Sequence, residues 1–161
     1  MNGRSTHPMS TRAVLALAAW LCAGIGSAHS ATFRVDDSAS LPADTSVAMK
    51  WQSLAPTRAA SHLVEGATLV TVRLNLAPWV NKTGKIYMAL AHQPVGLVSA
   101  EWSTQGILLP GQLNSGSRTL VYAGPVRSAR LEDTIALKIL TDGRRLSAPQ
   151  RLNFYFEIDV D

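Results

Sequence analysis

The segment Arg151-Leu-Asn-Phe-Tyr-Phe-Glu-Ile-Asp-Val-Asp161 ends the chain with an apolar residue at every second position. The apolar positions are Leu152, Phe154, Phe156, Ile158 and Val160. Successive side chains of a strand point to opposite faces, so this pattern gives one apolar face and one polar face. It predicts a half-buried β-strand at about 150–160 that helps close a domain.

Similar alternation recurs in short segments bounded by turn residues, as in all-β proteins. The clearest further examples lie at 47–52, 68–77, 85–91, 98–102 and 135–140. We expect 68–77 and 85–91 to pair as a hairpin through the turn at 81–84. Asp142-Gly143 is a second hairpin signal, because both residues tolerate a positive φ.

Seven to nine short strands with hardly any helical period predict an all-β fold. The economical architecture is a two-sheet antiparallel sandwich, with an immunoglobulin-like order as the first choice. A jelly roll or an open barrel is the alternative. The Cys–Trp–Cys pattern of antibody domains is absent, so the topology rests on the number of strands alone.

The beginning of the chain has the three parts of a secretory signal peptide. Residues 1–12 are polar and basic, 13–26 form an apolar run, and 26–31 are mostly small. We predict cleavage after Ser30, with Ala28 as a second possible end. An uncleaved anchor is the alternative, although the run is shorter than the roughly 20 residues that span a bilayer.

Cleavage at this point would leave residues 31–161 as a single β-sandwich domain of 131 residues, a length that suits one domain. Cys22, the one cysteine, lies in the leader after Leu21, where a lipid-attachment signal requires a small residue. The processed chain would therefore have no disulfide, no thiolate nucleophile and no cysteine ligand. We expect no membrane insertion after cleavage.

Charge argues against nucleic acid as a partner. The whole chain has a formal net charge of +4, which falls to +2 once Arg4 and Arg12 leave with the leader. The basic pair Arg144-Arg145 is the longest basic run in the processed chain. Binding to phosphates usually needs clustered Lys and Arg, so we interpret this pair as a solvated turn.

No motif in the sequence defines a catalytic or metal site. His62 and His92 are 30 residues apart, and a zinc site needs three or four ligands. Met49 and Met88 are in phase with apolar positions and are expected in the core. The acid pairs are Asp36-Asp37, Glu132-Asp133 and Asp159 with Asp161. We expect these acids to be solvated at turns or strand edges, and we predict no enzyme activity, no cofactor and no metal.

Aromatic residues are the best candidates for a binding site. Trp51 and Trp102 are in phase with apolar positions, which predicts burial. Trp79 follows a strand and precedes a turn, so it either lies exposed at one end of the sandwich or, as we favour, caps the core. Tyr87 and Tyr155 lie on the polar sides of their strands and extend a candidate binding face.

We therefore expect an exported non-catalytic module that acts by protein–protein contact in the bacterial periplasm or cell envelope. Its partner would be another envelope or extracellular protein. The alternative is a carbohydrate- or small-ligand-binding module that uses Trp79 with Tyr87 or Tyr155. A pilus-type subunit that exchanges a donor strand is a minority alternative, because only Phe33 and Val35 alternate before the first acidic break.

Overall fold

The computed structural model describes residues 31–44, 46–53, 62–93, 98–146 and 148–160. The predicted leader at 1–30 lies outside the described residues. The described part contains ten strands and two short 3-10 turns. The strands are β1 (Ala31–Arg34), β2 (Leu41–Pro42), β3 (Lys50–Trp51), β4 (Leu63–Asn75), β5 (Thr83–Leu90), β6 (Val98–Thr104), β7 (Gly111–Asn114), β8 (Arg118–Pro125), β9 (Arg130–Asp142) and β10 (Phe154–Val160).

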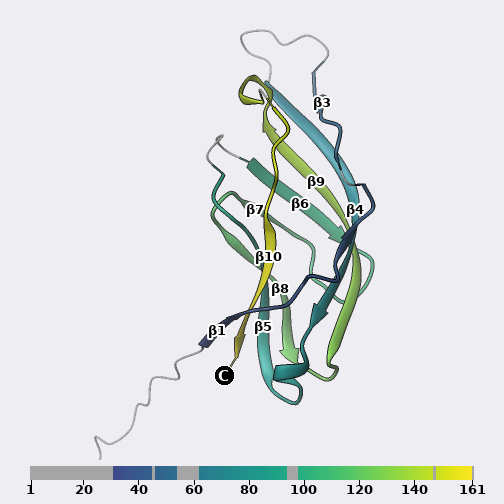
Figure 1. Ribbon diagram of the computed structural model, residues 1–161, viewed down its shortest axis with the longest axis vertical. Helices are drawn as coiled ribbons and strands as arrows, with labels where there is room; N and C mark the ends of the chain where they lie inside the picture. Colours follow the sequence, from purple (N-terminus) through teal and green to yellow (C-terminus); the bar gives the residue numbers. More distant parts are fainter. Residues whose placement is uncertain (1–30, 45, 54–61, 94–97, 147, 161) are drawn as a thin grey trace, which may run out of the picture.

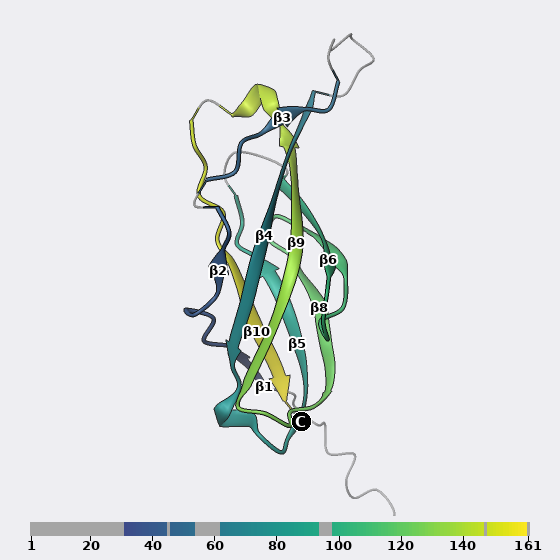
Figure 2. The same ribbon diagram turned by 90° about the vertical axis from the view of Figure 1, so that its right-hand side faces the viewer.

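Two antiparallel sheets pack face to face, which confirms the predicted sandwich (Figures 1 and 2). The four-stranded sheet has the order β1-β10-β5-β8. The second sheet has the order β2-β4-β9-β6-β7, with β3 also paired to β4. The immunoglobulin-like strand order remains a prediction.

The expected hairpin between 68–77 and 85–91 is wrong. β4 pairs with β9, whereas β5 pairs with β10 and β8 in the other sheet. The connection between β4 and β5 contains the 3-10 turn η1 (Ala77–Trp79), with Pro78 inside it, and then Asn81 with a φ of 68°. This connection is an arch: it carries the chain across the core, so that the apolar faces of β4 and β5 oppose each other instead of lying side by side.

The second expected hairpin is also wrong, for a similar reason. Asp142 caps the 3-10 turn η2 (Gly143–Arg145), and its side chain accepts a hydrogen bond from the Arg144 backbone N–H at 3.0 Å. The Arg144 side chain lowers the pKa of Asp142 to about 2. From η2 the chain passes to the other sheet, where β10 pairs with β5 over Phe154–Val160. The predicted terminal strand is therefore confirmed, with a start a few residues later.

The core lies between the two sheets and is closed along the β7–β8 side. Trp102 is buried there, as predicted, and its indole Nε1 donates to the Leu109 carbonyl at 3.0 Å. Its ring lies against Gly111, where an added Cβ would stand 2.8 Å from the ring atom Cζ2. Met88 is buried and Met49 packs against the core, which confirms their expected role.

On the opposite side of the sandwich, the segment from β1 to β2 passes from one sheet to the other. β1 pairs with the last residues of β10, and the Val35 N–H still donates to the Phe156 carbonyl at 2.9 Å. Asp36 then forms a bridge to Asn75 of β4, and β2 pairs with β4 in the other sheet. β1 therefore pairs with only part of β10 before the chain crosses to the other sheet.

Candidate functional site

Trp79 lies in the core, which is the placement that we favoured from the sequence. It is 8% exposed and belongs to the main hydrophobic cluster. Its ring centroid lies 6.0 Å from that of Phe33, with the two planes tilted by 44°. Trp79 therefore caps the core beside β1, and it does not lie on the face that carries the two tyrosines.

Tyr87 and Tyr155 share the outer face of the four-stranded sheet. Tyr87 lies on β5 and Tyr155 on β10, at diagonal positions of the ladder between these strands. The guanidinium carbon of Arg118 lies 4.2 Å from the centre of the Tyr87 ring, and that of Arg34 lies 4.1 Å from the centre of the Tyr155 ring. One face of each tyrosine ring is thus covered by a guanidinium group, as in other cation–π pairs.

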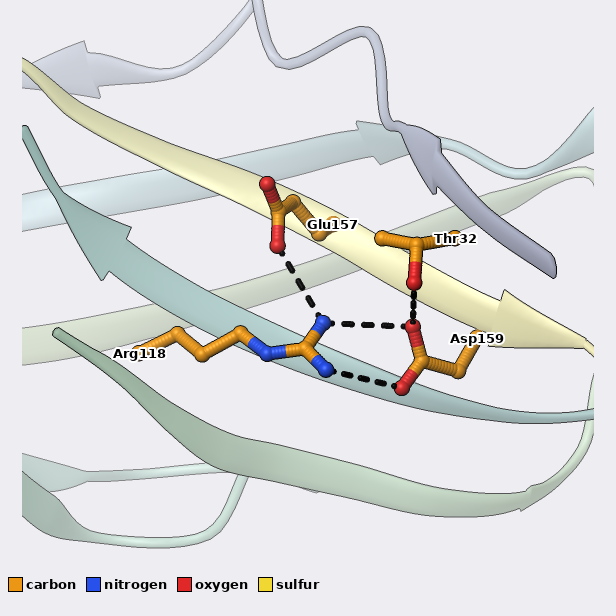
Figure 3. Close-up of polar contacts among 4 residues, drawn as sticks. All are labelled: Thr32, Arg118, Glu157 and Asp159. Carbon is orange, nitrogen blue, oxygen red and sulfur yellow. Dashed lines mark hydrogen bonds and ion pairs between the residues drawn. The ribbon is translucent and has the colours of Figure 1, made fainter. Parts of the chain in front are cut away.

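A polar cluster on the same face joins three strands (Figure 3). Arg118 of β8 reaches across β5 to β10, where both of its terminal nitrogens lie 3.2 Å from the Asp159 carboxylate oxygens. One of these nitrogens also lies 3.2 Å from Glu157. Thr32 of β1 donates to Asp159 at 2.6 Å. The cluster therefore holds β1 against β10.

The electrostatics of this cluster are those of a structural ion pair. Partial burial raises the pKa of Asp159, but the hydrogen bonds from Thr32 and Arg118 outweigh that effect and keep its pKa below the ordinary value. The hydrogen bond to Asp159 raises the pKa of Arg118. A carboxylate held ionised in this way is poorly suited to act as a general acid near neutral pH.

Trp51 is 50% exposed, so the prediction that it lies in the core is wrong. β3 pairs with the first residues of β4, at the end of the sandwich beyond β10 and β5 (Figure 1). The ring packs instead on the η2 turn, where a Cβ added to Gly143 would stand 2.6 Å from the ring atom Cη2. Trp51, and not Trp79, is therefore the tryptophan with an exposed ring.

Asp133 is buried, so the expectation that the acids of these pairs are solvated is wrong for this residue. It is 6% exposed, and its side chain accepts hydrogen bonds from the backbone N–H groups of Leu108 at 2.8 Å and Thr134 at 2.7 Å. Alternation places it on the inner face of β9, so backbone donors take the place of water. Within the described ranges, no three His, Cys, Asp or Glu side chains come together as a metal site would require.

An apolar groove with a volume of about 890 Å³ lies between the two sheets. It lies on the side where β1 leaves β10. One wall is β10 and residues 148–153 before it, and the other is formed by residues of 37–44 and 46–49 with β4 and β9 behind them. The apolar side chains that line it include Val47, Met49, Val70, Met88, Leu137, Ile139, Phe154 and Phe156.

The rim of this groove is polar and partly acidic. Asp37, Asp44, Ser38 and Ser40 line it along the crossing segment, and Arg151 lies on the β10 side. Gly66 of β4 allows Met49 to pack closely against that strand, because a Cβ at position 66 would stand 2.6 Å from the sulfur of Met49. These lining residues define the groove.

Sequence reasoning did not find the groove. Its apolar residues all obey strand alternation, and such a pattern does not distinguish a covered core from an open one. One signal was present: Val47 and Met49 alternate in a segment rich in Asp and Ser, which is unusual for a buried strand.

Comparisons with family models, with curated proteins and with solved structures found no match. Among the described residues, no helix is long and apolar enough to cross a membrane.

Proposed function

We propose that the chain is an exported, non-catalytic β-sandwich module of the bacterial periplasm or cell envelope that acts by protein–protein contact. In this proposal the groove receives an extended segment of another protein. The observation that supports it most is an apolar groove that runs beside a strand whose outer edge is only partly paired. The leader-like beginning of the chain supports export.

The edge of β10 offers backbone groups for strand addition. In the described part of the chain, β10 has β5 on one side and β1 on the other, and β1 reaches only as far as Val35 opposite Phe156. The residues of β10 before Phe156 have no strand on that side among those described. An open strand edge pairs readily with an incoming extended peptide, which gains main-chain hydrogen bonds.

The groove also defines the chemistry of the incoming segment. Alternate side chains of a strand point to one face, so residues at every second position would enter the groove and should be apolar. The residues between them would point away from the groove into solvent and should be polar. The expected partner segment therefore alternates apolar and polar residues.

A short synthetic peptide that alternates valine or phenylalanine with arginine tests this proposal. It should bind the purified processed chain, whereas a peptide of the same composition with its apolar residues in one block should not. Val70→Lys, inside the groove, should abolish binding. Leu69→Lys is the matched control, because Leu69 is the adjacent residue of β4 and is exposed on the outer face. No binding to the wild-type chain would contradict the proposal.

A pilus-type subunit stays a minority version of this function. It would require a strand from another copy beside β10, whereas β1 already pairs with part of β10 within the chain. A processed chain that refolds alone to a stable monomer would exclude an obligatory exchange of this strand.

Carbohydrate binding is the second candidate, and the half-exposed ring of Trp51 favours it. Trp51 lies on the other sheet from Tyr87 and Tyr155, so these residues would not form a single site. A glycan array without a signal for the wild-type chain would remove this candidate. If a glycan does bind, Trp51→Ala should abolish binding and leave the fold intact.

A further inference from the structure

The outer face of the six-stranded sheet has an uncharged middle. β2, β4, β9 and β6 lie side by side in this order, with β4 and β9 at the centre (Figure 2). Leu69, the middle residue of β4, pairs with Ala136 of β9, and Ala136 pairs with Ser103 of β6. Leu41 of β2 pairs with Thr71, two residues along β4 from Leu69. We call this region, together with the charged residues at its two ends, the β4–β9 face.

The two halves of this middle differ in shape. Leu41 and Leu69, on β2 and β4, are 57% and 48% exposed and stand out from the sheet. Ala136 and Ser103, on β9 and β6, are small, and together with Ala67 they line a shallow hollow beside Leu69. One half of the face therefore projects, and the adjacent half is recessed.

Two ion pairs of opposite direction lie at the two ends of the face. At one end the acid is on β4 and the base on β9, where Glu65 and Lys138 lie 3.1 Å apart. At the other end the base is on β4 and the acid on β9, where Arg73 and Glu132 lie 3.2 Å apart. All four side chains are between 36% and 51% exposed. Between the two pairs, the outward residues of β4 and β9 are uncharged, namely Ala67, Leu69, Thr71, Thr134 and Ala136.

We propose that two copies of this chain pair through the β4–β9 face, about a two-fold axis that runs along the strands between β4 and β9. This axis places β4 of one copy over β9 of the other. Leu69 then enters the hollow at Ala136 of the second copy, and Leu41 lies over β6 near Ser103. Each contact occurs twice, as in any isologous interface. Side chains of two sheets interdigitate in this way at a separation of about 10 Å.

The ion pairs fit the same arrangement. Arg73 of each copy lies over Glu132 of the other, so the four side chains form a ring of alternating charge. Glu65 and Lys138 do the same at the other end, which leaves an uncharged centre between two polar rims. A two-fold axis across the strands would instead place Arg73 over Glu65 and Leu69 over its own copy, so that projecting residues would meet each other.

This pairing goes beyond the proposed function and does not depend on it. β4 and β9 contribute inward residues such as Val70 and Leu137 to the groove, whereas their outward residues form the β4–β9 face. Pairing through the outer face therefore leaves the grooves of both copies available. A dimer of this kind would present two grooves to a partner protein that carries two extended segments.

Sedimentation equilibrium of the purified processed chain tests the pairing. Wild-type protein should show a monomer–dimer equilibrium. Leu69→Asp places a charge at the centre of the interface and should weaken dimerisation by about thirtyfold or more. Leu109→Asp is the matched control, because Leu109 is 45% exposed on the loop between β6 and β7, and it should dimerise like wild type. A wild-type chain that stays monomeric at its highest attainable concentration would overturn the inference, and so would a dimer that survives Leu69→Asp.

Charge reversal tests the direction of the axis. Arg73→Glu should weaken dimerisation by about tenfold or more at low salt, because like charges then face each other. The double variant Arg73→Glu with Glu132→Arg restores the pair within each chain and also between copies, so it should dimerise like wild type. About an axis across the strands, the new acid at position 73 would face Glu65. Loss of the dimer in the double variant would therefore overturn the proposed arrangement.

The alternating peptide separates this inference from the proposed function. The Leu69→Asp monomer should bind the peptide like wild type, because the substitution lies on the outer face. Peptide binding by a wild-type chain that never dimerises would overturn the pairing and leave the proposed function standing. A wild-type dimer that does not bind the peptide would overturn the proposed function and leave the pairing standing.

Discussion

The carboxylate of Asp133 accepts a hydrogen bond from the backbone N–H of Leu108 at 2.8 Å, across 25 residues of sequence. It also accepts from the N–H of Thr134. Gly106 lies so close to this carboxylate that an added Cβ would stand 2.6 Å from Oδ1. A buried acid thus serves as the anchor of an exposed loop, and no pattern in the sequence indicated that role.

Replacing Asp133 with alanine should therefore destabilise the fold. The buried N–H of Leu108 and the part-buried N–H of Thr134 would lose this acceptor, which costs about 1–3 kcal/mol in the free energy of unfolding. Glu132→Ala is the control, because Glu132 is exposed and forms a surface ion pair with Arg73, worth at most about 1 kcal/mol. Urea denaturation of both variants measures the difference. Equal losses would contradict the anchoring role.

The tryptophans should differ sharply in accessibility to solvent. Trp51 is half exposed, whereas Trp79 and Trp102 are buried. Acrylamide quenching of the processed chain should therefore come mainly from Trp51 and should largely disappear in Trp51→Phe.

Trp51 and Trp102 should also differ in how much their replacement lowers the free energy of unfolding. Trp51→Phe should change the free energy of unfolding by no more than about 0.5 kcal/mol. Trp102→Phe removes the indole donor to the Leu109 carbonyl and should cost about 1–3 kcal/mol. A larger cost for Trp51→Phe than for Trp102→Phe would show that the ring of Trp51 is buried in solution.

The Asp159 cluster should make stability depend on acid pH. The pKa of Asp159 is lower in the folded chain than in the unfolded one, so its contribution is full above the unfolded pKa of about 3.9 and is lost as pH falls through the folded pKa. Asp159→Asn should therefore lower stability at neutral pH and flatten its decline below about pH 4. Urea midpoints across this range measure the effect. An unchanged slope in Asp159→Asn would contradict this role.

Export and processing make a separate prediction about the beginning of the chain. A secreted form should start at Ala31, or after Ala28 if the second cleavage position is used. Intact mass and N-terminal sequencing of the periplasmic or secreted protein measure this directly. A product that retains the apolar run at 13–26 would instead support the uncleaved anchor.

The alternation of the sequence was sufficient to place the main strands and the fold class. β4, β5, β6, β9 and β10 all overlap the segments that the pattern indicated, although β4 and β9 begin earlier, at Leu63 and Arg130, and β10 begins later, at Phe154. Alternation reports which side chains share a face, and this is a local property of a strand. It does not report which strand lies beside it, so both predicted hairpins were wrong although their strands were right.

The sequence by itself thus determined that most of the described residues form strands with one apolar face, because side-chain period is set by the backbone of each strand. Only the tertiary structure decided how the faces are covered. Trp79 is buried, Trp51 is half exposed and Asp133 is buried beneath a loop, whereas the described residues leave the groove beside β10 uncovered. Coverage depends on contacts between residues far apart in the chain, and above all on where β1 leaves β10, which no local pattern encodes.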